Sequence, residues 1–215
     1  MLSGSLSQGL WNPFANGSAP GESNIERIDF LFSGGYTVQE GDAVVLFDLE
    51  NYGDLGDGFR IAAYTATGTV NGVANAPTAF ATTGLLIQPN SMGAAVSTGN
   101  TTNPRWISSF TTSGNSLASG QDIQLVDSNS GSASWSDGFL NGVLIHFSDL
   151  GLTAGQTIYG YSLMAGDVSA SSANDLVNWN NTAVFRTDTD AATWGNVDFA
   201  GFGGQLARPV PEPRT

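Results

Sequence analysis

The stretch Asp42-Ala43-Val44-Val45-Leu46-Phe47-Asp48 places five consecutive apolar residues between two carboxylates. Successive side chains of a β-strand point to opposite faces of the sheet. A short apolar run without polar alternation is therefore typical of a strand that is buried on both faces. We predict such a strand over residues 42–48.

Two Asn-Gly pairs suggest how other strands are connected. Asn71-Gly72 lies between Val70 and Val73, and Asn141-Gly142 lies within the apolar stretch 135–147. Both residue types tolerate a positive φ, so each pair predicts a two-residue turn that joins two strands in a hairpin.

Further strand-like segments occupy most of the remaining chain. In residues 25–32, the side chains of Ile28, Phe30 and Phe32 share one face. Other candidates are residues 59–64, 85–88, 106–110, 122–126, 157–165, 183–186 and 197–202. Residues 171–179 predict one helical turn with Ser172 as its N-cap. Turn signals recur about every 8–12 residues, which favours a sandwich or barrel.

Composition agrees with an all-β fold. The chain has 215 residues, 28 glycines and no cysteine. We predict a single-domain antiparallel β-sandwich, jelly-roll-like or Ig-like, with little helix. Residues 1–23 are expected to be an extended arm anchored by Trp11 and Phe14, residues 24–207 the sandwich, and residues 208–215 a proline-rich tail.

The charge balance limits the partners. Six arginines and no lysine stand against 19 acidic residues, for a net charge of −13. This surplus repels phosphate backbones, so we expect no nucleic-acid binding. The sequence contains no run of 18 apolar residues, so we predict no membrane-spanning helix. Met1 to Ser5 have no basic or apolar signal region, as expected if the numbering begins in a mature, exported chain.

The tail contains Val210-Pro211-Glu212-Pro213. It resembles the sorting motif of PEP-CTERM proteins, which Gram-negative bacteria export and process at the outer surface. In that family a hydrophobic membrane span and an arginine-rich end follow the motif. Neither follows here, as expected of a processed chain. The resemblance implies an extracellular or outer-surface location.

Two internal regions show a related resemblance. Residues 24–30, and the segments 159–163, 167–168 and 175–179, are similar to β-rich modules of large secreted bacterial surface proteins. The resemblance covers about half of the chain. The resemblance implies no defined catalytic activity.

Catalytic patterns are scarce in the sequence. The one histidine, His146, falls on the strand face opposite Val143 and Ile145, where a histidine needs no function. No Gly-x-Ser-x-Gly elbow occurs, and no pair of histidines is present for a zinc site. Nineteen carboxylates leave open a hydrolase that works with two of them. We predict no catalytic residues.

One acidic loop is a candidate calcium site. Asp48, Glu50, Asp54 and Asp57 lie within ten residues that also contain glycines. Calcium takes six to eight oxygen ligands in a flexible site, and this loop offers several. The alternative is a turn-rich loop whose aspartates bond to its own backbone. A second, weaker candidate combines the carboxylates of Asp188, Asp190 and Asp198.

Two tryptophans are candidate sugar-binding residues. Trp179 and Trp194 lie in loop-like contexts, where an indole can stack on a sugar ring, although large aromatic residues more often pack in cores. This pattern supports an alternative function, a lectin-like module that binds polysaccharide with or without calcium.

Our first hypothesis is instead a structural protein of the bacterial surface or matrix. A β domain without a reactive centre offers sheet edges that a neighbour's strand can complete. We expect the arm, residues 1–23, or the tail to be the donor. The partner is then the protein itself, in a head-to-tail homopolymer that forms a filament.

Overall fold

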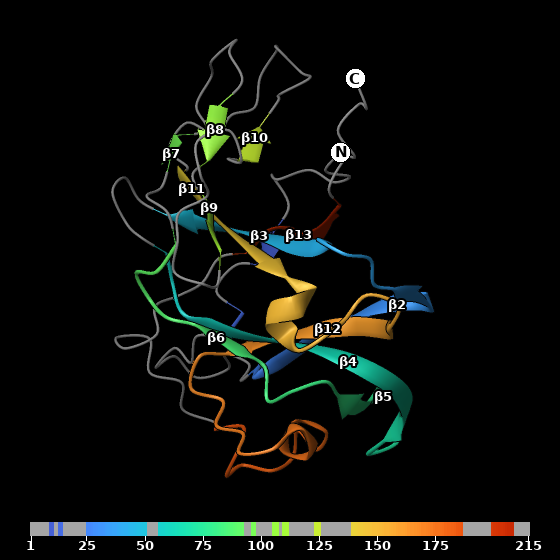
Figure 1. Ribbon diagram of the computed structural model, residues 1–215. Coiled ribbons are helices and arrows are strands. Elements are labelled where there is room, and N and C mark those ends of the chain that lie inside the picture. The colour runs from blue at the N-terminus through green and yellow to red at the C-terminus, as the bar shows by residue number, and fades with distance from the viewer. Residues whose placement is uncertain are drawn as a thin grey trace.

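The protein folds as two antiparallel β-sheets packed face to face, as seen in the computed structural model (Figure 1). The structure describes residues 9–10, 13–14, 25–50, 56–92, 96–97, 105–107, 109–111, 123–125, 139–186 and 199–208. The prediction of an all-β sandwich is confirmed.

Strand β3 is an interior strand of the first sheet. The order is β1 (Gly9–Leu10), β13 (Phe199–Ala207), β3 (Ala43–Glu50), β11 (Phe139–His146) and β7 (Val96–Ser97), and β9 (Ser109–Thr111) also pairs with β11, in parallel. Residues 43–47 of β3 are at most 3% exposed. The predicted strand buried on both faces is therefore confirmed, with β13 and β11 on its two sides.

The second sheet packs below the first in Figure 1. Its order is β2 (Arg27–Thr37), β12 (Thr157–Ala165), β4 (Phe59–Val70) and β5 (Val73–Phe80), and β6 (Leu85–Ile87) also pairs with β4. A small separate pair is formed by β8 (Arg105–Ile107) and β10 (Ile123–Leu125).

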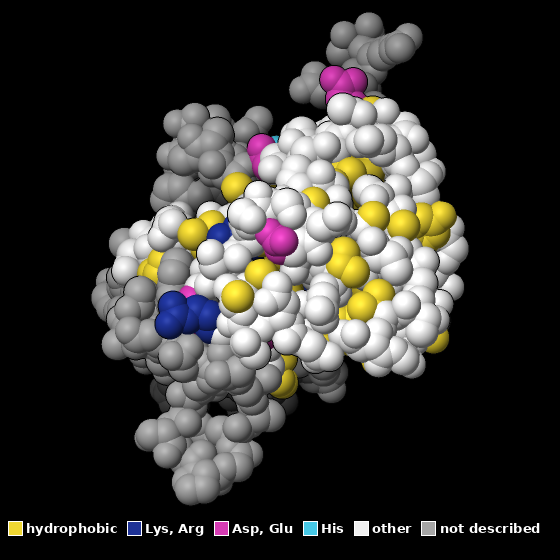
Figure 2. All heavy atoms as spheres, turned by 90° about the horizontal axis from the view of Figure 1, so that it is seen from below, with side chains coloured by type: hydrophobic (Ala, Val, Ile, Leu, Met, Phe, Trp, Pro, Cys, Tyr) yellow, Lys and Arg dark blue, Asp and Glu magenta, His cyan; other side chains and the backbone are white. Residues whose placement is uncertain are grey.

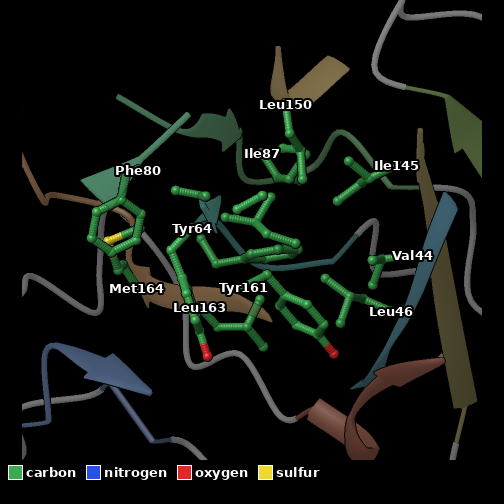
Figure 3. Close-up of a cluster of buried hydrophobic side chains, with 14 of the residues drawn as sticks. Val44, Leu46, Tyr64, Phe80, Ile87, Ile145, Leu150, Tyr161, Leu163 and Met164 are labelled. Atoms are coloured by element: carbon green, nitrogen blue, oxygen red, sulfur yellow. The ribbon is translucent and has the colours of Figure 1, made fainter. Parts of the chain in front are cut away.

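The core fills the space between the two sheets. Figure 3 shows Val44, Leu46 and Ile145 of the first sheet opposite Tyr161 and Leu163 of the second. These side chains alternate with outward-facing ones because the side-chain period of a strand is two. Burial of this apolar surface is the main contribution to folding.

A third layer covers the outer face of the second sheet. We call residues 166–186 the covering segment. It contains the 3-10 helix η2 (Ala173–Leu176), which follows the predicted N-cap Ser172, and another 3-10 helix, η1 (Phe147–Leu150), follows β11. Leu176 and Phe185 of the covering segment are fully buried. Both faces of the second sheet are thus partly shielded from water.

One Asn-Gly prediction is confirmed and the other is wrong. Asn71-Gly72 forms the turn between β4 and β5, with φ of 49° and 83°. Asn141-Gly142 forms no turn, because it continues β11: Asn141 pairs with Asp48, and Gly142 pairs with Phe47. Gly142 also pairs with Ser109 of β9, so ladders on both sides keep the backbone extended. Tertiary pairing here outweighs local turn preference.

The strand predicted over 183–186 is also wrong. The backbone N–H groups of Val184 and Phe185 both donate to the carbonyl of Asn181, as in a turn. The apolar side chains are buried because this turn packs on the second sheet as part of the covering segment. Burial alone therefore produced the strand-like pattern.

Candidate functional site

The outer edge of the first sheet is formed by β13 and by the N-terminal arm. β1 pairs antiparallel with β13, and Gly9 lies opposite Ala200 while Leu10 lies opposite Phe199. β13 extends to Ala207, so β1 covers only its first two residues. Beyond Ala200, no other described strand pairs with this side of β13. A sheet edge of this kind presents backbone groups that a further strand can bind.

Phe14 fixes the arm to the domain. Its side chain is 4% exposed and belongs to the main hydrophobic core. Its ring meets Phe199 edge-on, with centroids 5.9 Å apart, and Phe199 in turn meets Phe59 of the second sheet at 5.0 Å. Burial of a Phe side chain contributes about 1.5–3 kcal/mol. We call the edge of β13 at Phe199 and Ala200, together with the core contact of Phe14, the arm seat.

The edge of the second sheet at β2 is built differently. Between Leu31 and Tyr36 the strand has four residues where β12 has one, so it bulges. Gly34 and Gly35 take φ of 82° and 80° within this bulge. Bulges twist an edge and interrupt its hydrogen-bonding row, which hinders the addition of another strand. The long β2 edge is thus a poorer acceptor than its length suggests.

The predicted calcium loop begins with a buried aspartate. Asp48 is fully buried in β3, and its Oδ2 accepts a hydrogen bond from the backbone N–H of Asp57 at 3.0 Å. This contact closes the loop between β3 and β4, as expected of an aspartate that bonds to its own loop backbone.

The remaining members of that loop are only partly described. Glu50 ends β3, but its side chain lies outside the described part, as does Asp54. Within the described ranges, no three His, Asp or Glu side chains gather as metal ligands. The second acidic candidate, Asp188, Asp190 and Asp198, also lies outside the described residues.

Trp179 packs against an arginine at the edge of the covering segment. The guanidinium of Arg27 lies 4.9 Å from the centroid of the Trp179 ring, and 5.7 Å from those of Phe80 and Phe185. The Arg27 side chain is only 4% exposed. Cation–π contacts of this kind strengthen when water is excluded. Trp179 is partly buried against the core, while Trp194 lies outside the described residues.

Arg27 also holds the covering segment by hydrogen bonds. It donates to the carbonyl of Leu176 and forms a 2.9 Å ion pair with Asp29, which in turn accepts from the hydroxyl of Ser162 at 2.6 Å. Arg60 of β4, on the other side of β12, acts similarly: its Nε donates to the carbonyl of Val168 at 3.0 Å. Two of the six arginines therefore attach this layer to the sheet.

A second polar cluster joins the start of the tail to the sandwich. Asp42 accepts from Tyr36 at 2.6 Å, from the Gln39 N–H at 2.7 Å and from Arg208 Nε at 2.9 Å. Arg208 also donates to the Tyr36 hydroxyl. Asp42 is almost fully buried, whereas Arg208 is half exposed. Arg208 is the first residue of the proline-rich tail, and the rest of the tail, residues 209–215, lies outside the described part.

Hydrogen bonding determines the ionisation of this cluster. Desolvation raises the pKa of Asp42, but the bonds from Arg208, Tyr36 and Gln39 outweigh it, so the pKa lies below its usual value. Burial and the bond to Asp42 raise the pKa of Tyr36. The positive charge of Arg208 thus helps to keep the buried Asp42 side chain ionised. Sequence reasoning missed this pair, since the only signals were the position of Asp42 beside the apolar run and the scarcity of basic residues.

His146 lies where it was predicted, half buried on the face opposite the buried Val143 and Ile145. Its backbone N–H donates to Asp149 Oδ2 at 3.1 Å, which caps η1. No described helix is long and apolar enough to span a membrane.

Comparison with known proteins adds no family. No protein-family model, no curated protein and no solved structure matches the chain.

Proposed function

We propose that this chain is an exported, non-enzymatic structural protein of the bacterial surface or matrix, and that its copies assemble by β-strand complementation. The observation that carries the proposal is the arm seat. A short N-terminal segment pairs with the edge of the first sheet through Gly9 and Leu10 and buries Phe14 in the core. Strand addition plus a side-chain anchor is the general mode of β-augmentation.

The character of the surface supports the same proposal. Figure 2 views the molecule from below, where mainly uncharged polar and backbone atoms are visible, with few charged side chains. Hydrophobic atoms on the described part of this face occur in small scattered groups. No large apolar docking patch competes there with the sheet edges as a contact site.

The position of Arg208 supports attachment through the tail. The bonds from Arg208 join the last described residue to Asp42, which directly precedes β3, and to Tyr36 of β2. A tail that starts at such a cluster can transmit tension to the centre of the sandwich. The resemblance of residues 210–213 implies an extracellular or outer-surface location, which agrees with this proposal.

Electron microscopy of the protein as its native cells release it tests the proposal. We expect regular fibres. Their loss in EDTA, with circular dichroism unchanged, would assign calcium a role in assembly, and we expect Asp48→Asn to mimic this loss if the loop at Asp48 is the site. Dispersed particles at all concentrations, with and without EDTA, would contradict the polymer.

The alternative function is a carbohydrate-binding module. The partly exposed indole of Trp179 favours it, although Arg27 stacks on that ring. We expect a binding module to retain polysaccharide on an affinity gel and to lose it in Trp179→Ala. A glycan array that stays silent with and without calcium would count against this alternative.

A further inference from the structure

The contact between the arm and its own domain is small and lies close to the end of the chain. It consists of two paired residues, Gly9 and Leu10, and one buried ring, Phe14. The next described residue in the chain is Ile25, which precedes β2 in the other sheet. Ten residues, 15–24, connect the two, and their sequence is Ala-Asn-Gly-Ser-Ala-Pro-Gly-Glu-Ser-Asn.

The arm seat does not depend on which chain supplies the arm. The same ladder with Phe199 and Ala200, and the same edge-on contact between Phe14 and Phe199, form whether the arm comes from the same chain or another. The connection and the protein concentration then determine which arrangement is populated. Exchange of an identical element between copies is a low-cost route to assembly.

We propose that residues 9–14 of one chain occupy the arm seat of a second copy. This inference rests on the proposed function and specifies its donor and its acceptor. The partner is another copy of this chain, bound at the β13 edge through backbone pairing and through Phe14. Strand β2 is not the acceptor, because its bulge at Gly34 and Gly35 interrupts the row of free backbone groups.

The edge of β13 has room for such an exchange. β13 contains nine residues, and the observed β1 pairs with only two of them. Leu206, near the other end of the strand, is 43% exposed. A longer pairing along this edge would cover Leu206. Because the ladder is antiparallel, this longer pairing would use residues that precede Gly9, and Phe14 would keep its contact with Phe199.

Cysteine cross-linking tests the exchange directly, because the natural chain has no cysteine. Gly9 and Ala200 are paired across an antiparallel ladder, where the Cα atoms of opposite residues are about 4.5–5.5 Å apart. That separation is within the range of about 4.4–6.8 Å that a disulfide requires. Full-length Gly9→Cys and Ala200→Cys chains, with tags of different size, are mixed, concentrated and oxidised.

We expect a mixed disulfide that joins the two tagged chains and increases with concentration. The matched control replaces Gly9→Cys by Val73→Cys, because Val73 is 53% exposed on the other sheet. It should give at least tenfold less product. Equal yields from the two mixtures would overturn the exchange, whereas fibres in the microscope would still support a polymer built by another contact.

A second measurement tests the exchange without relying on disulfide formation, in case the cysteine pair reacts poorly. The mass of Phe14→Ala is compared with that of the natural chain by analytical ultracentrifugation, with the near-ultraviolet spectrum as a check of folding. We expect the variant to remain folded and monomeric at concentrations where the natural chain assembles. An unchanged assembled mass for folded Phe14→Ala would overturn the proposal.

Discussion

Gly160 in β12 offers a sharp test of the packing described above. Its φ is 150°, and a Cβ built there would lie 1.9 Å from the carbonyl oxygen of Phe30 and 2.2 Å from the hydroxyl oxygen of Tyr64. Tyr64 is fully buried and donates a 2.7 Å hydrogen bond to that carbonyl. The phenol of Tyr64, which belongs to β4, passes directly over Gly160 of β12 to reach Phe30 of β2. The missing side chain at Gly160 is what makes this bond possible.

The cost of Gly160→Ala has two parts. A residue other than glycine at this backbone conformation costs on the order of 1–3 kcal/mol. Overpacking of a filled core adds about 1–3 kcal/mol, and more where the obstacle is backbone. We therefore expect a loss of at least about 3 kcal/mol, a large share of the roughly 5–15 kcal/mol typical of folded domains. For a chain of this length that corresponds to a fall in Tm of about 6–12 °C.

Gly155 provides the matched control. Its φ is 90°, but nothing lies within 4 Å of its Cβ position. Gly155→Ala therefore carries the backbone cost alone, about 1–2 kcal/mol. Both variants are unfolded in urea at constant pH, with matched m-values required. A difference of less than about 0.5 kcal/mol between them would refute the close packing of Tyr64 and Phe30 over Gly160.

The remaining predictions concern the polar clusters and the net charge. Because the pKa of Asp42 is depressed in the fold, its contribution to stability is present above its unfolded value of about 3.8 and is lost as the pH falls through the lower folded value. Asp42→Asn should therefore lower the free energy of unfolding at neutral pH, and this difference from the natural chain should diminish as the pH falls below about 3.8, which urea unfolding measures. Arg27→Leu removes the cation beside the partly exposed Asp29 and the hydrogen bond to the Leu176 carbonyl, and should cost about 1–3 kcal/mol, with faster hydrogen exchange over residues 166–186 than in the natural chain. Assembly of a chain with net charge −13 should speed up between 0.01 and 0.15 M salt as repulsion is screened, which light scattering measures; an opposite salt trend would contradict contacts made through sheet edges.

Local patterns in the sequence predicted most of the strands. The apolar run 43–47 favoured a strand shielded on both sides, and Asn71-Gly72 could form a tight turn at little steric cost. Phe14 was expected to anchor the arm, and it does so. Each of these features depends on residues that are close together in the chain, so period and turn chemistry were sufficient to predict them.

The wrong strand and turn predictions occur where pairing with distant strands outweighs the local conformational preference of the residues. Asn141-Gly142 has the same composition as the true turn at 71–72, but β3 and β9 pair with it and keep it extended. The order of the strands in each sheet also depends on which distant segments meet. Sequence periodicity carries no information on those partners, because it reports only which face of a strand is buried.

The candidate sites also divide into features that neighbouring residues determine and features that bring distant residues together. The candidate calcium loop and the candidate sugar-binding tryptophans could be proposed from the sequence, because such proposals depend on residue type and spacing. The bond between Asp42 and Arg208 joins residues 166 positions apart, and that between Arg27 and Leu176 spans 149. The arm seat likewise joins the first fourteen residues to Phe199. Folding brings these groups together because long-range strand pairing and core burial place them side by side, and no short-range pattern encodes which distant groups will meet.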